Sequence, residues 1–193
     1  MDESFIHHHS RAKDSLYHPT DAPDLQPKEK HKGQRLCFIA GILSDGPDDS
    51  HVLGLHIFKG GRNQPKDYHG MFDHAYFVKW FAGLLDQLDA LGKVGAIIVL
   101  DNASYHIDLP DNTPKGNWAK PRLLEACGQL GNPASDSEYK SEIWEKVRRY
   151  IKENVQPVIV SMAAQRGHTV KYTPPYHSRL QPIELVWACG LTG

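Results

Sequence analysis

The sequence predicts an α/β protein in which helices pack on a mixed sheet, and three observations lead to this class. Two early apolar segments, 35–43 and 51–58, have the length and pattern of paired strands. The helix-period segment 77–91 is followed by a continuous apolar run at 96–100. Helical and strand-like segments then alternate along the rest of the chain. The 193 residues are enough for one such domain with a substantial buried core.

The first third of the chain predicts three strands. An extended segment runs over residues 2–9, and the charged, proline-containing stretch 11–32 predicts a long loop. Residues 35–43 are almost all apolar or small, which is typical of a buried strand. A turn over 44–50 leads into 51–58, whose alternating apolar positions predict a hairpin partner for the preceding strand.

The middle of the chain predicts a helix followed by a central strand. Asp73 is a candidate N-cap, and Gly92 supplies the stop after an apolar stripe. The stripe consists of Phe77, Phe81, Leu84, Leu88 and Leu91. Residues 96–100, Ala-Ile-Ile-Val-Leu, are typical of a strand that is covered on both faces. This strand leads directly into Asp101 and Asn102.

The second half predicts mainly helices. Helical patterns cover 120–130 and 141–154. Pro157 is expected to break or kink the second of these helices, and a further helix then runs to residue 167. Residues 168–172 predict a short strand, and Pro182 is suited to the first turn of a last helix. The predicted order is therefore β, β, β, α, β, a helix-rich insert, β and α.

The composition excludes several classes of protein. No apolar run approaches the roughly 20 residues that cross a bilayer, which excludes a membrane-spanning helix, and the start of the chain resembles no secretory leader. The three cysteines, Cys37, Cys127 and Cys189, are far apart, which excludes a disulfide framework and a zinc knuckle and predicts a reduced intracellular compartment. The formal charge of -1 excludes a protein that coats nucleic acid through its overall charge.

Two stretches nevertheless concentrate positive charge locally. Residues 51–66 and 154–183 contain basic side chains and no acidic ones. Such patches can pair with the phosphates of DNA, while solvated surface charge is the alternative for each patch taken singly. The candidate DNA-binding residues in these stretches are Lys59, Arg62, Lys66, Lys171 and Arg179.

Three acidic residues stand at the ends of predicted elements. Asp2 lies on the first strand, Asp101 follows the apolar strand, and Glu184 lies in the first turn of the last helix. Carboxylates that are brought together stay ionised only if a cation neutralises them, and Mg²⁺ prefers such oxygen ligands. Two such ions, roughly 3.5–4 Å apart, can assist an in-line phosphoryl displacement. An acid at a strand end is more often a turn or cap residue, so that alternative stays open.

Three blocks of sequence surround these acids in the same order along the chain. They are Met-Asp-Glu-Ser-Phe at 1–5, Val-Leu-Asp-Asn-Ala-Ser-Tyr-His at 99–106, and the segment 173–187. The third block contains Pro-Pro-Tyr, then Leu-Gln-Pro-Ile-Glu and a Trp, a combination that rarely occurs by chance. The blocks resemble the signature motifs of DDE transposases of the mariner superfamily, and the resemblance covers nearly the whole chain.

The resemblance implies an RNase H-like fold: a mixed sheet flanked by helices, with a helical insert at about 110–166 between the second and third acids. The whole chain, 1–193, would form one catalytic domain. Asp2, Asp101 and Glu184 would be its catalytic and metal-binding residues, holding two Mg²⁺ or Mn²⁺ ions. The implied activity is cleavage and joining of DNA strands, with transposon ends and target DNA as partners. The implied location is the nucleus, and a homodimer is one expected assembly.

Two departures from the family pattern lead to an alternative function. The chain begins at the first triad acid, so the family's N-terminal helix-turn-helix region is expected to be missing. The segment 189–193 ends the chain where the family's last helix would continue with basic residues. We therefore expect a truncated copy, and the alternative is a catalytically inactive, transposase-derived module that binds DNA or protein.

The histidines leave two further questions open. His106 lies a few residues after Asp101 and is a candidate for DNA contact. The alternative is that its side chain packs in the core. The tract at residues 7–9 has three consecutive histidines, which can bind a transition metal. Only His7 and His9 would share a face of a strand, so a metal hydrolase that uses these two with Asp101 is a third, weaker hypothesis.

Overall fold

The computed structural model describes residues 1–7, 35–46, 49–59, 73–175, 177, 180, 181, 183 and 186. These residues form a mixed α/β structure, which confirms the class that the sequence predicts. In chain order the elements are β1 (Asp2–His7), β2 (Arg35–Ser44), β3 (Ser50–Lys59), α1 (His74–Ala90), β4 (Ile97–Leu100), the 3-10 helix η2 (Ser104–His106), α2 (Lys120–Gln129), α3 (Lys140–Asn154), α4 (Val158–Gln165) and β5 (Thr169–Tyr172).

Strands β1, β2 and β3 form an antiparallel sheet with β2 in the centre, so the predicted hairpin of β2 and β3 is confirmed. The register of this hairpin shifts between Ile39 and Gly41. On the opposite strand Gly54 has a φ of 61°, which glycine adopts without steric cost. The irregular segment is fixed to α1, because Trp80 Nε1 donates to the Gly54 carbonyl at 2.6 Å and the Gly54 N–H donates to Gln87 Oε1 at 2.9 Å.

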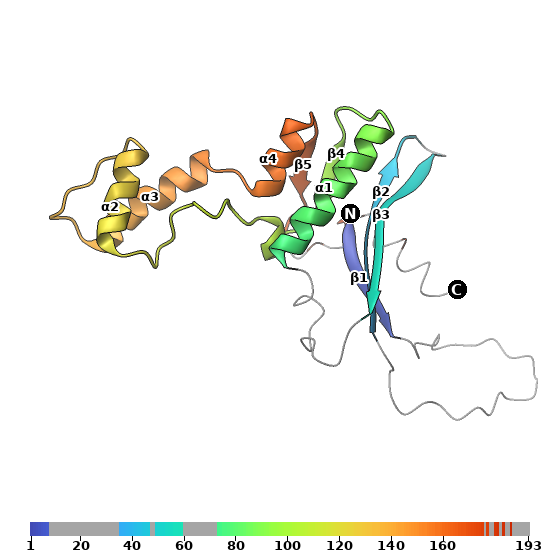
Figure 1. Ribbon diagram of the computed structural model, residues 1–193, viewed down its shortest axis with the longest axis horizontal. Helices are drawn as coiled ribbons and strands as arrows, with labels where there is room; N and C mark the ends of the chain where they lie inside the picture. Colours follow the sequence, from blue (N-terminus) through green and yellow to red (C-terminus); the bar gives the residue numbers. More distant parts are fainter. Residues whose placement is uncertain are drawn as a thin grey trace, which may run out of the picture.

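Strands β4 and β5 form a separate parallel pair, in which Ile97 lies opposite Thr169 and Leu100 opposite Tyr172. One contact ties this pair to the antiparallel sheet. The N-terminal ammonium of Met1 donates to the Val99 carbonyl at 3.0 Å, so the start of β1 lies beside β4. This contact brings the first residues of the chain to the end of a strand that is far away in sequence (Figure 1).

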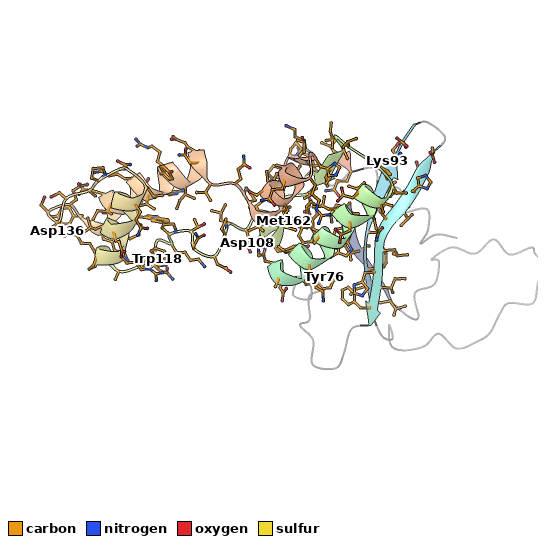
Figure 2. The ribbon with its side chains drawn as sticks, turned by 45° about the horizontal axis from the view of Figure 1, so that its top comes forward. Tyr76, Lys93, Asp108, Trp118, Asp136 and Met162 are labelled. Carbon is orange, nitrogen blue, oxygen red and sulfur yellow. The ribbon has the colours of Figure 1, made fainter. Side chains whose placement is uncertain are left out.

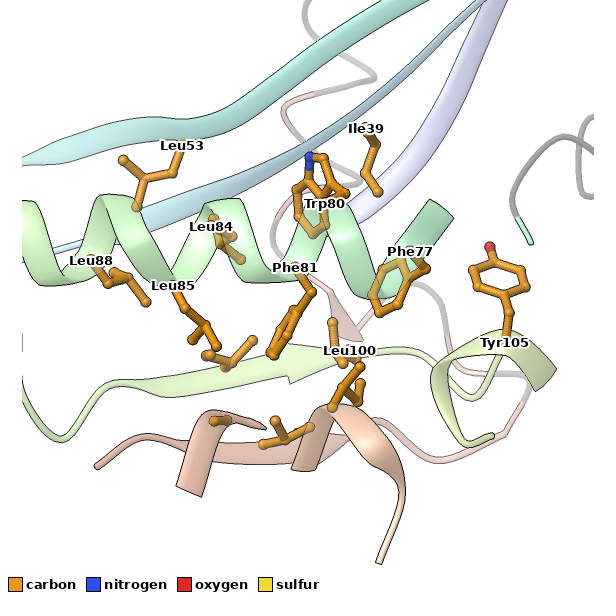
Figure 3. Packing of buried hydrophobic residues seen from close by; sticks show 14 of the residues in the cluster. Ile39, Leu53, Phe77, Trp80, Phe81, Leu84, Leu85, Leu88, Leu100 and Tyr105 are labelled. Carbon is orange, nitrogen blue, oxygen red and sulfur yellow. The ribbon is translucent and has the colours of Figure 1, made fainter. Parts of the chain in front are cut away.

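Helix α1 forms the centre of the main hydrophobic core (Figure 3). The Asp73 side chain accepts from the Tyr76 N–H at 2.8 Å, which confirms the predicted N-cap. The buried side chains of α1 contact residues from both sheets and from α4, including Ile39, Leu100 and Ile159. We call β1 to β5, α1, η2 and α4 the body, because the described buried apolar residues of these elements belong to this one cluster, apart from Ala40.

The expectation that β4 is covered on both faces is wrong for the described part of the chain. Ile98 and Leu100 are buried against α1 and α4, whereas Ile97 is 68% exposed and Val99 is also exposed. Helices α1 and α4 contribute to the same cluster as Ile98 and Leu100, so they cover one face of β4. An apolar run alone indicates a strand but does not show how many of its faces are covered.

Helices α2 and α3 form a second, smaller core. Their buried residues Leu123, Cys127, Ile143, Val147 and Ile151 make up a cluster of their own. We call residues 109–155 the helical unit, because Leu109 and Val155 are the first and last residues that pack against this cluster. Figure 1 shows α2 and α3 at one end of the molecule and β1 to β3 at the other.

The junction between the body and the helical unit is narrow. The Val158 N–H donates to the Asp108 carbonyl at 3.1 Å, so the segments that enter and leave the unit meet there. Figure 2 places Asp108 between Trp118 of the unit and Met162 of the body. Helix α4 lies on the body side and packs into its core, although the predicted insert extended to about 166. No helix in the described ranges is both long and apolar enough to cross a membrane.

Candidate functional site

Asp101 lies directly after β4, at the carboxyl end of that strand, where α/β proteins commonly bind ligands. Its Oδ1 accepts from the Ala103 N–H at 3.0 Å, which turns the chain toward η2. The side chain is 42% exposed, so a ligand from solvent can reach it. Asn102 next to it donates from Nδ2 to the Thr173 carbonyl, and the Thr173 N–H donates to the Leu100 carbonyl at 2.8 Å. The second and third sequence blocks therefore meet at Asp101.

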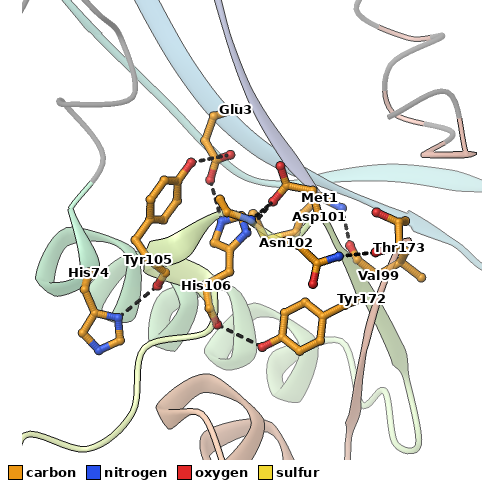
Figure 4. Close-up of polar contacts among 11 residues, drawn as sticks. Met1, Glu3, His74, Val99, Asp101, Asn102, Tyr105, His106, Tyr172 and Thr173 are labelled. Atoms are coloured by element: carbon orange, nitrogen blue, oxygen red, sulfur yellow. Dashed lines mark hydrogen bonds and ion pairs between the residues drawn. The ribbon is translucent and has the colours of Figure 1, made fainter. Parts of the chain in front are cut away.

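The 3-10 helix η2 places His106 behind Asp101. His106 Nδ1 lies 2.7 Å from Asp101 Oδ1, and its Nε2 lies 3.2 Å from Glu3 Oε1 (Figure 4). The imidazole is only 1% exposed. Burial lowers its pKa, but the interactions with Asp101 and Glu3 outweigh this effect and raise the pKa to about 9. His106 is therefore a cation between two carboxylates at neutral pH.

Glu3 is a buried residue of this site that the sequence analysis did not identify. Its carboxylate is held by His106 and by the Tyr105 hydroxyl, which donates to Oε2 at 3.2 Å. Burial, and after it the charge of Glu3, raises the pKa of Tyr105, so the phenol stays protonated and donates. One signal in the sequence could have found Glu3. Neighbours on a strand face opposite sides, so an acid next to Asp2 must lie on the other face of β1, where it needs partners.

Asp2 and Asp101 come together around the start of the chain. Burial lowers the pKa of the Met1 ammonium, and the charges of Asp2, Glu3 and Asp101 oppose this effect. All three carboxylates are therefore close enough to act on a single ammonium group. Asp2 itself is buried and pairs with Ala40 at the start of β1. Two of the three predicted catalytic acids are thus brought into one neighbourhood by the contact between β1 and β4.

The other predicted site residues are placed less completely. Glu184, Arg62, Lys66 and Arg179 lie outside the described residues, as does His9. Lys59 ends β3 and His7 ends β1, and only their backbones are described. Lys171 is exposed on β5, opposite Val99 of β4.

His106 was a candidate for DNA contact, and the structure corrects this role. A side chain that is 1% exposed and lies between two carboxylates does not reach a phosphate from this position. Its observed partners are Asp101 and Glu3, so we assign it to the support of the acidic site.

The acidic side chains of the site are oxygen ligands of the kind that bind divalent cations. Among residues 1–4, 36–46, 49–58 and the others with described side chains, no group of three or more His, Cys, Asp or Glu can hold a metal ion. Asp2 and Asp101 supply the hard oxygen ligands that Mg²⁺ and Mn²⁺ prefer, and Mg²⁺ commonly uses one or two protein carboxylates. The two carboxylates therefore fit such an ion in their chemistry.

Comparisons of the chain with protein-family models, with curated proteins and with solved structures find no match.

Proposed function

We propose that the chain is the catalytic domain of a DDE-type enzyme that cuts and joins DNA strands with the help of divalent cations. Asp2 and Asp101 are two of its acidic residues, and Glu184 is the third. The observation that carries the proposal is the contact of Met1 with Val99, because Asp2 follows Met1 directly and Asp101 lies two residues after Val99. This pairing of distant acids is what the three sequence blocks lead one to expect.

The strand arrangement supports an RNase H-like interpretation of the fold. The antiparallel strands follow the order β1, β2, β3, and the free side of β1 faces the parallel pair through Met1 and Val99. The spatial order is then β3, β2, β1, β4, β5, a mixed set of strands with helices α1 and α4 on one side. In this arrangement Asp2 is the first residue of β1, and Asp101 directly follows the adjacent strand β4.

Each residue of the site has a separate role in the proposed reaction. Asp2 and Asp101 would hold the cation. A bound cation would neutralise negative charge on the phosphodiester. His106 holds the Asp101 carboxylate from behind. Lys171 offers an exposed positive charge one strand away, where it can pair with the DNA backbone and help to orient it.

A nicking assay tests the proposal. The full chain is incubated with supercoiled plasmid and either Mn²⁺ or Mg²⁺, and conversion to open circles is measured. Asp101→Asn is expected to lower the nicking rate about 100-fold or more, because the loss of a ligand removes several kcal/mol of transition-state stabilisation. Asp111→Asn, at an exposed acid near the junction, is the matched control and should nick at the normal rate. Equal rates for Asp101→Asn and the parent chain would refute the proposed chemistry.

One observation favours the alternative of a catalytically inactive binding module. His106 already places a buried positive charge beside Asp101, so this carboxylate has a cationic partner without a metal. The same preparation distinguishes the two functions. A chain that retards the plasmid at low salt, releases it at high salt and never nicks it is a binding module.

A further inference from the structure

The dipeptide Asp2-Glu3 places two carboxylates on opposite faces of one strand. Successive side chains of a strand point to opposite sides, so Glu3 faces the core when Asp2 faces the other way. Glu3 is buried and contacts the two consecutive residues Tyr105 and His106 of η2. The strand that supplies one acid of the site therefore also anchors the short helix behind the other acid.

We propose that Glu3 and His106 are positioning residues, which hold the Asp101 carboxylate in one orientation, with Glu3 acting through His106. The inference rests on the proposed function in one respect, because we take the cation as the ligand that this orientation serves. It adds two residues, one of them not anticipated from the sequence, to the acids that would bind the cation.

Asp101 Oδ1 is fixed by two groups from the same short segment. The Ala103 N–H donates to it at 3.0 Å, and His106 Nδ1 lies 2.7 Å away. Two contacts to one oxygen restrict rotation about the bond that carries the carboxylate. The position of this oxygen therefore depends on the imidazole of His106.

Other residues hold His106 in turn, and Figure 4 shows its contacts with Glu3 and Tyr172. Its Nε2 contacts Glu3 at 3.2 Å, and its ring packs in a tilted arrangement against Phe77 with 4.2 Å between the ring centroids. The Tyr172 hydroxyl of β5 donates to the His106 carbonyl at 2.9 Å, which fixes the backbone as well. Without Glu3, the buried Nε2 would lose its acceptor, and the ring would have reason to turn away from Asp101.

In this arrangement Glu3 and His106 do not bind the cation themselves but support Asp101, which would bind it. Histidines and carboxylates behind a ligand set its orientation, and their removal typically costs 10–100-fold in metal affinity. The two ring nitrogens of His106 lie close to one carboxylate each, Nδ1 at 2.7 Å from Asp101 and Nε2 at 3.2 Å from Glu3. Tyr105 donates to the second oxygen of Glu3, so both oxygens of this carboxylate contact η2.

The test measures Mn²⁺ affinity of the full chain by titration calorimetry, with folding checked by circular dichroism. His106→Ala is expected to bind roughly 10–100-fold more weakly. His106→Asn keeps an N–H donor near the place of Nδ1 and is expected to recover most of the affinity. Glu3→Gln keeps the shape of the side chain and a hydrogen-bond acceptor but removes the negative charge. Its Mn²⁺ affinity should therefore lie between that of His106→Ala and that of the parent chain.

Two controls separate positioning from general effects. Glu125→Gln removes one negative charge from the exposed surface of α2, and it should bind Mn²⁺ as the parent chain does. A merely structural role would lower the melting temperature of His106→Ala and His106→Asn alike and leave both affinities unchanged. If His106→Ala does not fold, the nearly isosteric Glu3→Gln still decides the question.

The outcomes distinguish this inference from the proposed function. If Asp101→Asn abolishes binding while Glu3→Gln and His106→Ala bind normally, the positioning role is refuted and the cation site stands. If the parent chain binds no Mn²⁺, the proposed function fails, and the carboxyl ¹³C signal of Asp101 decides the inference. A shift of this signal in Glu3→Gln but not in Glu125→Gln supports positioning, and an unchanged signal refutes it.

Discussion

The body and the helical unit are built from different kinds of contact. The core of the unit joins residues of two helices that are close in sequence, such as Leu123 and Ile143. The core of the body joins segments from β2 to β5, and its site depends on contacts as distant as Met1 with Val99 and Glu3 with His106. The helical unit can therefore fold through contacts that are local in sequence, whereas the body folds only when segments far apart in the sequence come together.

The two regions also differ in what they bury. The cluster of the helical unit is apolar apart from the thiol of Cys127. Among the described residues, the buried aspartate, glutamate and histidine side chains all lie outside the helical unit; they are Asp2, Glu3, His106 and His168. Burying such groups costs free energy unless they are paired, so their concentration in one region indicates a functional rather than a structural requirement.

The largest effect is expected from a cavity in the core of the body. Phe81→Ala removes a fully buried ring that packs among α1, β4 and α4, and should lower the free energy of unfolding by about 3–5 kcal/mol. Urea denaturation followed by circular dichroism measures this loss. Leu91→Ala, at an exposed position just after α1, is the control and should change it by about 0.5 kcal/mol or less. A loss below about 1 kcal/mol for Phe81→Ala would argue against this core.

A cavity in the helical unit should have a large but local effect. Leu123→Ala is expected to cost about 2–5 kcal/mol within α2 and α3, because the side chain is fully buried there. Amide hydrogen exchange should accelerate in these two helices and stay slow in α1 and β4, since the unit meets the body at a narrow junction. Uniform acceleration throughout the chain would show that the two regions unfold as one.

A pH effect of about 3 kcal/mol is expected in the body alone. His106 has a pKa of about 9 in the folded chain, above its ordinary value of 6.5, so the folded state holds this proton more tightly. The stabilisation is fully present below pH 6.5 and is lost as the pH rises through 9. Urea denaturation of the parent chain between pH 6 and 9.5 should show this loss. His106→Asn, which cannot titrate, should lack it, and an identical pH dependence in both proteins would contradict the ion pairs of His106.

Local patterns were enough to predict most elements of the fold. The cap at Asp73, the stripe that includes Phe77 and Phe81, and the hairpin of β2 and β3 all depend on residues near each other in sequence. The assignment of α4 to the body was not predictable in this way. Its helical period is the same in either core, and only tertiary packing decides which one receives Ile159.

The candidate site could be predicted only in part, for a similar reason. Sequence blocks indicated Asp2 and Asp101, and the structure brings these two together near Met1. The contact between His106 and Glu3 could not be predicted from the sequence. Glu3 is far from His106 in the sequence and lies on the inner face of β1. Glu184 lies outside the described residues, so its part in the site remains a prediction.

The most direct test of the account is a double-mutant cycle on Mn²⁺ affinity with Asp2→Asn, Asp101→Asn and the combined variant. If the two carboxylates share one cation, each single variant loses affinity, and the double variant loses less than the sum by about 1–3 kcal/mol. Losses that simply add, or a normal affinity in either single variant, would show that Asp2 and Asp101 do not form one site.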